Sequence, residues 1–143
     1  MSPEVGTILG LTQQKLASGF GEHGAAFAAG TVGLLGLMLN LSAQEYERGA
    51  DIRFAENTDL RALFGALAAS VQDAGLRARL EAAAAAKDAS LRISALNENN
   101  YPLRRLLTEL QIDAEARGDA EAQRRIWAVL KALAARRFVT FGA

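Results

Sequence analysis

The sequence predicts an all-α fold, an antiparallel bundle of about four helices built on a long helical hairpin. Apolar residues recur three and four positions apart along most of the chain, which is the period of a helix rather than of a strand. Alanine, the residue with the highest helix propensity, is abundant, and Pro3 and Pro102 are the only prolines among 143 residues. A chain of this length can bury a core of its own, so we expect a single domain over residues 1–143.

The first two elements differ in length. Residues 5–18 predict a short helix with a glycine-rich turn after it, and a long helix is expected from about residue 25 to residue 72. The stretch from residue 24 to residue 41 carries no charge, and we expect it to be a buried central helix. A membrane anchor and a surface covered by a partner are the alternatives. Its glycines are spaced like close-packing contacts and are candidate interface residues: Gly30, Gly33 and Gly36.

The most distinctive pattern is the sequence motif N-x-x-L-R-x-L, which occurs twice; we call it the repeated motif. It begins at Asn57 and again at Asn100, and each copy continues with apolar residues at helical spacing. Each copy therefore places one amide on an apolar stripe. We interpret both asparagines as candidate interface residues, because a buried amide can fix the register or the partner of packed helices. The alternative is that each amide is exposed or bonds a neighbouring side chain.

A turn at residues 73–75 is expected to end the long helix, with Gly75 in the left-handed conformation. The third helix is predicted to run from residue 76 to the turn at residues 118–119, kinked at Pro102 but continuous; its rival is a real break near residues 97–100. Antiparallel pairing then joins residues whose numbers sum to about 149. This register predicts an Arg61–Asp88 contact at a surface seam and no contact between Asn57 and Asn100.

The last helix is predicted over residues 120–138. Its cations are distributed around the helix and follow several acidic residues, which indicates favourable charge near a helix end rather than a nucleic-acid arm. We expect no nucleic-acid partner. The aromatic side chains of this region are candidate interface residues: Trp127, Phe138 and Phe141.

Polar residues interrupt the long helix at its middle, where bundle proteins often build sites. A ligand site there would use Tyr46, Asp51, Arg53, Glu98 and Tyr101. The alternative is a solvated face that carries helix ion pairs.

Composition argues against several kinds of chemistry. The chain has no cysteine and one histidine, His23, and it contains no Glu-x-x-His, so we expect neither a di-iron site nor any other metal or cofactor. Sixteen basic residues balance sixteen acidic ones. The lack of cysteine fits a cytoplasmic protein.

These patterns favour a non-catalytic helical interaction module: an adaptor, chaperone-like or assembly protein that acts through an exposed helical face. We expect a homodimer or a helical protein partner, because apolar helix faces that the chain's own core does not bury are favourably buried by a partner. The alternative is a small-molecule-binding or enzymatic bundle with a polar cavity near the middle of the long helices. A weaker alternative is peripheral association with a membrane.

Overall fold

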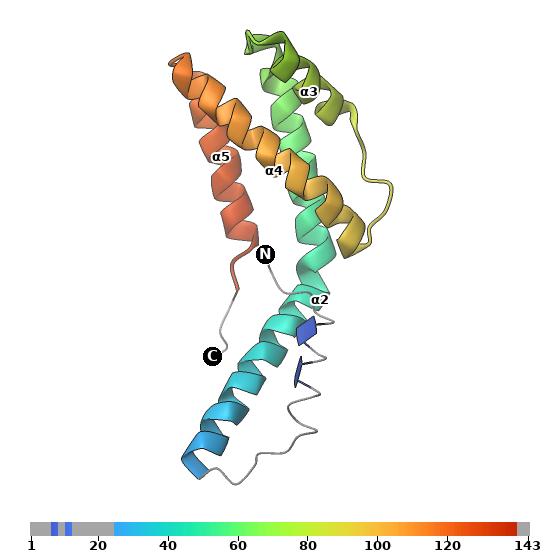
Figure 1. Ribbon diagram of the computed structural model, residues 1–143, viewed down its shortest axis with the longest axis vertical. Helices are drawn as coiled ribbons and strands as arrows, with labels where there is room; N and C mark the ends of the chain where they lie inside the picture. Colours follow the sequence, from blue (N-terminus) through green and yellow to red (C-terminus); the bar gives the residue numbers. More distant parts are fainter. Residues whose placement is uncertain (1–6, 9–10, 13–24, 140–143) are drawn as a thin grey trace. The chain divides into compact units, whose positions relative to one another are not determined.

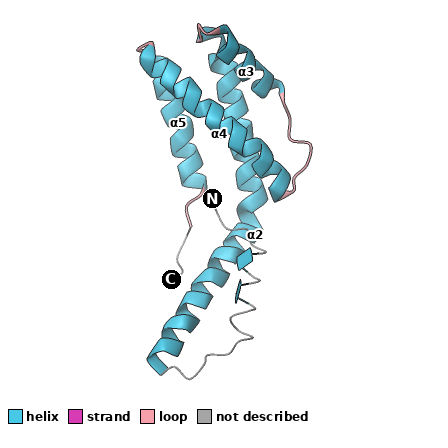
Figure 2. Ribbon diagram, viewed as in Figure 1, coloured by secondary structure: helices cyan, strands magenta, loops and turns pink. Residues whose placement is uncertain are grey.

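The computed structural model describes residues 7–8, 11–12 and 25–139, and within residues 25–32 it describes the side chains of 30 and 31 alone. Its helices are α2 (Ala25–Leu67), the 3-10 turn η1 (Ala68–Ser70), α3 (Ala74–Ala85), α4 (Ile93–Ala116) and α5 (Ala120–Arg136), as drawn in Figure 1. No described residue lies in a strand (Figure 2). The prediction of an all-α bundle is therefore confirmed.

The chain divides into two compact units. One comprises residues 1–49 with 139–143, and the other comprises residues 50–138. The second unit holds the second half of α2 together with α3, α4 and α5, and a single domain over residues 1–143 stays a prediction. Its core consists of apolar side chains that are at most 9% exposed: Leu60, Leu63, Phe64, Leu67, Ala68, Val71, Leu76, Leu80, Leu103, Leu106, Leu107, Leu110, Ala114, Ala122, Ile126 and Leu133.

Aspartates begin two of these helices. The Asp73 carboxylate accepts a hydrogen bond from the Leu76 amide at 2.6 Å, and Asp119 accepts one from the Ala122 amide at 2.9 Å, so each side chain caps a helix N-terminus. Gly75 lies in the first turn of α3, and its predicted left-handed conformation is wrong. Gly118 adopts that conformation instead, with φ of 64°, because the chain turns there between α4 and α5.

The predicted continuous third helix is also wrong. It ends at Ala85, a loop occupies residues 86–92, and α4 starts afresh at Ile93. The loop carries Asp88 into the bundle, where its carboxylate accepts hydrogen bonds from α2 and α4. These tertiary bonds override the helix propensity of the alanines before it. Pro102 lies inside α4, as predicted, and the rival break near residues 97–100 does not occur.

Because the loop reverses the chain, α4 runs in the same direction as α2. Two contacts show this direction: Arg53 Nε donates to Asn97 Oδ1 at 2.6 Å, and Asn100 Nδ2 donates to Asn57 Oδ1 at 2.9 Å. Residue numbers rise together along both helices, which excludes the predicted antiparallel register and corrects the prediction that the two asparagines do not touch. The first positions of the two copies of the repeated motif, Asn57 and Asn100, instead lie side by side.

The α2–α4 seam has heptad spacing, alternating three and four residues. Every position of the seam is at most 6% exposed, and the polar pair of asparagines sits among apolar neighbours. The positions on the first side are Arg53, Asn57, Leu60, Phe64 and Leu67 of α2 and Val71 directly after η1. The positions in α4 are Leu96, Asn100, Leu103, Leu107, Leu110 and Ala114.

Helix α5 runs antiparallel to α2. Arg136 bonds Asp59 and Arg137 bonds Glu56, so residue numbers rise on one helix as they fall on the other. Helices consecutive in the chain alternate in direction, which gives the second unit an up-down-up-down arrangement.

The uncharged segment at residues 24–41 was expected to be buried, and its described side chains correct that expectation. Leu34 is 57% exposed, Leu37 39% and Leu39 44%, whereas Leu35 is only 8% exposed. An apolar sequence shows that burying its side chains is favourable, but it does not show which surface they pack against. Of the short helix predicted at 5–18, residues 7–8 and 11–12 are helical, and the rest lies outside the described residues.

Candidate functional site

A cluster of polar side chains lies buried where α2 and α4 meet, around Asn57 and Asn100. Asn100 Nδ2 donates to Asn57 Oδ1 at 2.9 Å and to Glu56 Oε2 at 3.2 Å. Asn57 Nδ2 in turn donates to the Leu96 carbonyl oxygen at 3.2 Å. Glu56 and Asn57 are fully buried and Asn100 is 2% exposed, so these bonds replace water that the groups would otherwise bind.

Asp88 joins the loop at residues 86–92 to this cluster. Both of its carboxylate oxygens accept hydrogen bonds from Arg61 at 2.8 Å, Asn99 donates a third bond at 2.8 Å, and Asn57 donates a fourth at 3.1 Å. The Arg61 guanidinium is the main cause that holds the pKa of Asp88 below its ordinary value. The predicted Arg61–Asp88 contact is confirmed, but it lies inside the fold rather than at a surface seam, because the Asp88 side chain is fully buried.

Glu56 connects the same cluster to the end of α5. Arg137, the residue after α5, donates from Nε to Glu56 Oε1 at 2.5 Å and from a terminal nitrogen to Oε2 at 2.7 Å. A bidentate bond of this kind restricts orientation as well as distance. The buried cluster therefore ties α2, the loop, α4 and the end of α5 to one another.

Apart from Arg61 Nε, which is buried and has no hydrogen-bond partner, the cluster's bonded donors and acceptors are directed at each other. The bonds join particular positions of α2 to particular positions of α4, which is the kind of contact by which a buried asparagine fixes register in a coiled coil.

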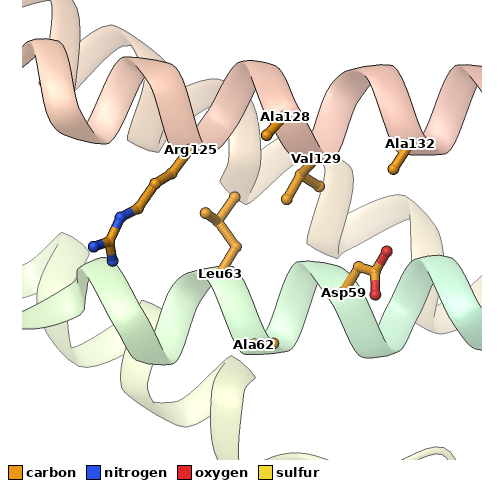
Figure 3. Close-up of a pocket in the computed structure, with 7 residues that line it drawn as sticks. All are labelled: Asp59, Ala62, Leu63, Arg125, Ala128, Val129 and Ala132. Atoms are coloured by element: carbon orange, nitrogen blue, oxygen red, sulfur yellow. The ribbon is translucent and has the colours of Figure 1, made fainter.

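A groove lies on the outside of the bundle between α2 and α5; we call it the α2–α5 groove. Figure 3 shows its floor, with side chains of both helices directed into the space between them. Its volume is 430 Å³. The groove is lined by Asp59, Ala62, Leu63, Arg125, Ala128, Val129 and Ala132.

The lining residues of each helix are spaced three and four apart, so they form one face of α2 and one face of α5. The middle of the groove is apolar, and its two charged residues stand toward opposite ends (Figure 3). Asp59 bonds Arg136 and Arg125 bonds Glu121, so both charges have partners within the chain. The sequence offers little signal for this groove, because three of its seven lining residues are alanines, which occur on any face of a helix.

The five residues predicted to form a ligand site do not share one environment. Tyr46 belongs to the first compact unit and is 79% exposed, and Tyr101 is 53% exposed. Asp51 and Glu98 are also exposed, whereas Arg53 is 6% exposed and bonds Asn97. A ligand site built from these residues stays a prediction.

The predicted interface residues fall into three groups. Asn57 and Asn100 are buried inside one chain, as described above. The glycines 30, 33 and 36 are exposed, as are Trp127 at 55% and Phe138 at 71%. Phe141 lies outside the described residues.

Among the residues that the structure describes, no cluster of three or more histidine, cysteine, aspartate or glutamate side chains is arranged to hold a metal ion. Within the same residues, no helix has the length and apolarity needed to cross a membrane. No family model, no curated protein and no solved structure matches the chain.

Proposed function

We propose that this protein is a non-catalytic helical interaction module, of the adaptor, chaperone-like or assembly type, and that its α2–α5 groove holds an apolar helix of a partner. The observation that carries the proposal is the groove itself: an apolar floor on the outside of a packed bundle, between two helices that present small side chains.

The dimensions of the floor suit a helix. On α5 the lining extends over the seven-residue step from Arg125 to Ala132, which is about 10 Å, or two turns. A helix laid along it can insert side chains at positions i, i+3, i+4 and i+7. The alanines leave room for larger side chains of the partner.

The bundle supports a groove that is formed before the partner arrives. The bonds of Arg136 to Asp59 and of Arg137 to Glu56 hold the end of α5 against α2. Helices fixed in this way lose little freedom when a partner binds, which favours affinity.

The alternative function, a small-molecule or enzymatic site near the middle of the long helices, has weaker support. Four of its five predicted residues are exposed, and the fifth, Arg53, bonds Asn97 across the α2–α4 seam.

Two substitutions of α5 alanines test the proposal. Ala128→Arg places a long cation on the groove floor, while Ala134→Arg makes the same change at an exposed position outside the lining. The probe is a fluorescein-labelled synthetic amphipathic helix with leucines at i, i+3, i+4 and i+7, and the measurement is fluorescence anisotropy. We expect binding by the unchanged protein and by Ala134→Arg, and a loss of about tenfold or more in Ala128→Arg.

Equal binding by the two variants, with unchanged circular dichroism, would show that the peptide binds elsewhere. No binding by the unchanged protein would count against the groove as a docking site for helices.

A further inference from the structure

We infer that Arg105 and Glu109 of α4 confine the helical partner to the α2–α5 groove, because they keep it from a second face of the bundle that is otherwise built in the same way. The inference rests on the proposed function and names residues that set its specificity. It follows from an internal symmetry of the second compact unit, in which residues 57–85 and residues 100–131 form two equivalent helical hairpins, the first and the second hairpin.

The two hairpins match in the burial of their residues. Counted from the asparagine of the repeated motif, the apolar seam positions have the same spacing in both hairpins, and all of them are buried: Leu60, Phe64, Leu67 and Val71 in the first, and Leu103, Leu107, Leu110 and Ala114 in the second. Helix α5 starts at Ala120, 46 residues after the start of α3 at Ala74. Every position from residue 74 to residue 85 is buried, half-buried or exposed exactly as the position 46 residues later is.

The hydrogen bonds of the two hairpins correspond as well. Four residues after the aspartate that caps α3, Arg77 Nε donates to the Val71 carbonyl oxygen at 2.9 Å. Four residues after the aspartate that caps α5, Gln123 Nε2 donates to the Ala114 carbonyl oxygen at 3.3 Å. Both carbonyls lie 14 residues after the asparagine of the repeated motif. A two-fold axis along the α2–α4 seam therefore exchanges α2 with α4 and α3 with α5, which lie on opposite sides of that pair in Figure 1.

This symmetry relates the α2–α5 groove to the face between α4 and α3. Leu63 of the groove corresponds to Leu106 of α4, which is also buried. The α5 side of the groove has a close counterpart on α3 and its C-cap, where Arg125, Ala128, Val129 and Ala132 correspond to Arg79, Ala82, Ala83 and Ala86. One side of the second face therefore has the small side chains that make the groove suitable for a helix.

The other side of the second face is different. In the groove this side has Ala62, with Ala66 one turn further along the same face of α2. The corresponding positions of α4 are Arg105 and Glu109. One hairpin therefore has two small apolar side chains where the other has two long charged ones. An apolar helix placed between α4 and α3 would have to desolvate these charges, which costs free energy.

An ion pair also links the two helices of the second face. Glu109 Oε2 of α4 lies 2.6 Å from a terminal nitrogen of Arg79 on α3. In the groove, Arg125, the counterpart of Arg79, pairs with Glu121 of its own helix instead. The charged side chains thus join α4 to α3, whereas they leave a volume of 430 Å³ between α2 and α5.

Counting bound helices tests the inference on the full chain. The probe is the fluorescein-labelled synthetic helix described above, titrated at a protein concentration well above the dissociation constant, so that the end point of the anisotropy curve gives the number bound. We expect one helix per chain for the unchanged protein and two for Arg105→Ala/Glu109→Ala. The matched control, Arg104→Ala/Glu115→Ala, removes the same charges from another face of α4 and should bind one.

Both double variants should fold, because the residues that they change are exposed or half-buried and the Arg79–Glu109 ion pair is exposed on both sides; circular dichroism checks this. Two helices bound to the unchanged chain, or only one bound to Arg105→Ala/Glu109→Ala, would overturn the inference.

A third substitution locates the second helix. Added to Arg105→Ala/Glu109→Ala, Ala82→Arg should close the new face and Ala128→Arg should close the α2–α5 groove, so that each triple variant binds one helix per chain. A second helix that remains bound in the presence of Ala82→Arg lies elsewhere, which would contradict the inference.

The reciprocal experiment gives α2 the charged residues of α4. Ala62 and Ala66 are both exposed, so Ala62→Arg/Ala66→Glu should fold. We expect its affinity for the synthetic helix to fall by about tenfold or more. Undiminished binding would show that charged residues at these positions do not exclude a helix.

These results separate the inference from the function beneath it. If the unchanged chain binds one helix, Ala128→Arg prevents that binding, and Arg105→Ala/Glu109→Ala still binds one, the groove holds helices but the residues named here do not confine them. If the unchanged chain binds no helix, the proposed function fails, and the inference fails with it.

Discussion

The hydrogen bond between Asn57 and Asn100 joins α2 to α4 inside the core. Removing the Asn100 amide takes away the donor that Asn57 Oδ1 has in a fully buried place, and it also removes one of the two bonds to Glu56 Oε2. We predict that Asn100→Ala lowers the free energy of unfolding by about 1–3 kcal/mol, which is the usual cost of a buried unsatisfied group. Urea denaturation measures it.

Asn40 provides the matched control for this prediction, because it is an exposed asparagine of a helix and Asn40→Ala should change stability by less than about 0.5 kcal/mol. A double-mutant cycle of Asn57→Ala with Asn100→Ala should show a coupling energy. Strictly additive losses would mean that the two amides act independently.

Asp88 makes stability depend on pH. Its pKa is lowered from 3.8, chiefly by the hydrogen bond from Arg61, so folding favours the deprotonated carboxylate. The stabilisation is fully present above the ordinary pKa and is lost as the pH falls through the lowered one. We predict that the difference in unfolding free energy between the unchanged protein and Asp88→Asn is widest above about pH 5 and narrows below about pH 4. Urea denaturation from neutral to acidic pH tests this, and a difference that stays constant with pH would contradict it.

At the scale of elements, the sequence predicted helices better than it predicted the direction in which they run. The end of α2, the continuity of α4 across Pro102 and the extent of α5 follow from local periodicity and from turn residues. The loop at residues 86–92 does not, because alanines lead into it and no proline or glycine marks it. Its cause is tertiary: in the loop, the Asp88 carboxylate accepts hydrogen bonds from Arg61, Asn57 and Asn99 together.

That one loop decides the topology. A continuous helix would have run antiparallel to α2. Because the helix breaks after Ala85, α4 instead runs parallel to α2, and the two copies of the repeated motif lie side by side. The Arg61–Asp88 contact was therefore predicted correctly from a register that does not exist. A pairwise contact alone is weak support for a topology.

The attachment of α5 to α2 gives a prediction at this scale. Arg137→Ala leaves the buried Glu56 carboxylate without its bidentate partner, whereas Arg136→Ala removes a bond to Asp59 that is one-third exposed on both sides. We expect a loss of about 1–3 kcal/mol for Arg137→Ala and less than about 1 kcal/mol for Arg136→Ala.

Hydrogen exchange locates these losses. In Arg137→Ala the amides in the last turns of α5 should exchange faster, because this arginine holds the helix end against α2. Equal destabilisation by the two variants would show that burial of Glu56 does not set the strength of this contact.

Across the whole molecule, sequence reasoning missed the α2–α5 groove but identified residues 24–41 as an apolar segment that would be buried or covered. The glycine-rich, uncharged segment was recognised as needing cover, and Leu34 and Leu37 are indeed exposed. The groove is built from Ala62, Ala128 and Ala132, which become a surface feature only when two helices are placed side by side. Placement of that kind comes from the fold and not from residue type.

The two compact units give one helix two different levels of protection. In the second half of α2, Leu60 and Phe64 are fully buried in the core, whereas Leu34 and Leu37 in the first half are exposed. Opening free energies follow buried apolar contact, so we predict that amides at residues 34–41 exchange with solvent faster than those at 57–67 at low protein concentration. Hydrogen exchange followed by mass spectrometry measures both segments in one sample.

Protein concentration then separates local opening from assembly. If a second copy covers the exposed side chains of Leu34 and Leu37, protection from exchange at residues 34–41 should rise with protein concentration, because binding stabilises the covered state by mass action. Leu37→Asp should abolish that rise, while protection at residues 57–67 stays the same in both proteins. Uniform protection along α2 at every concentration would contradict both the local opening and the self-association.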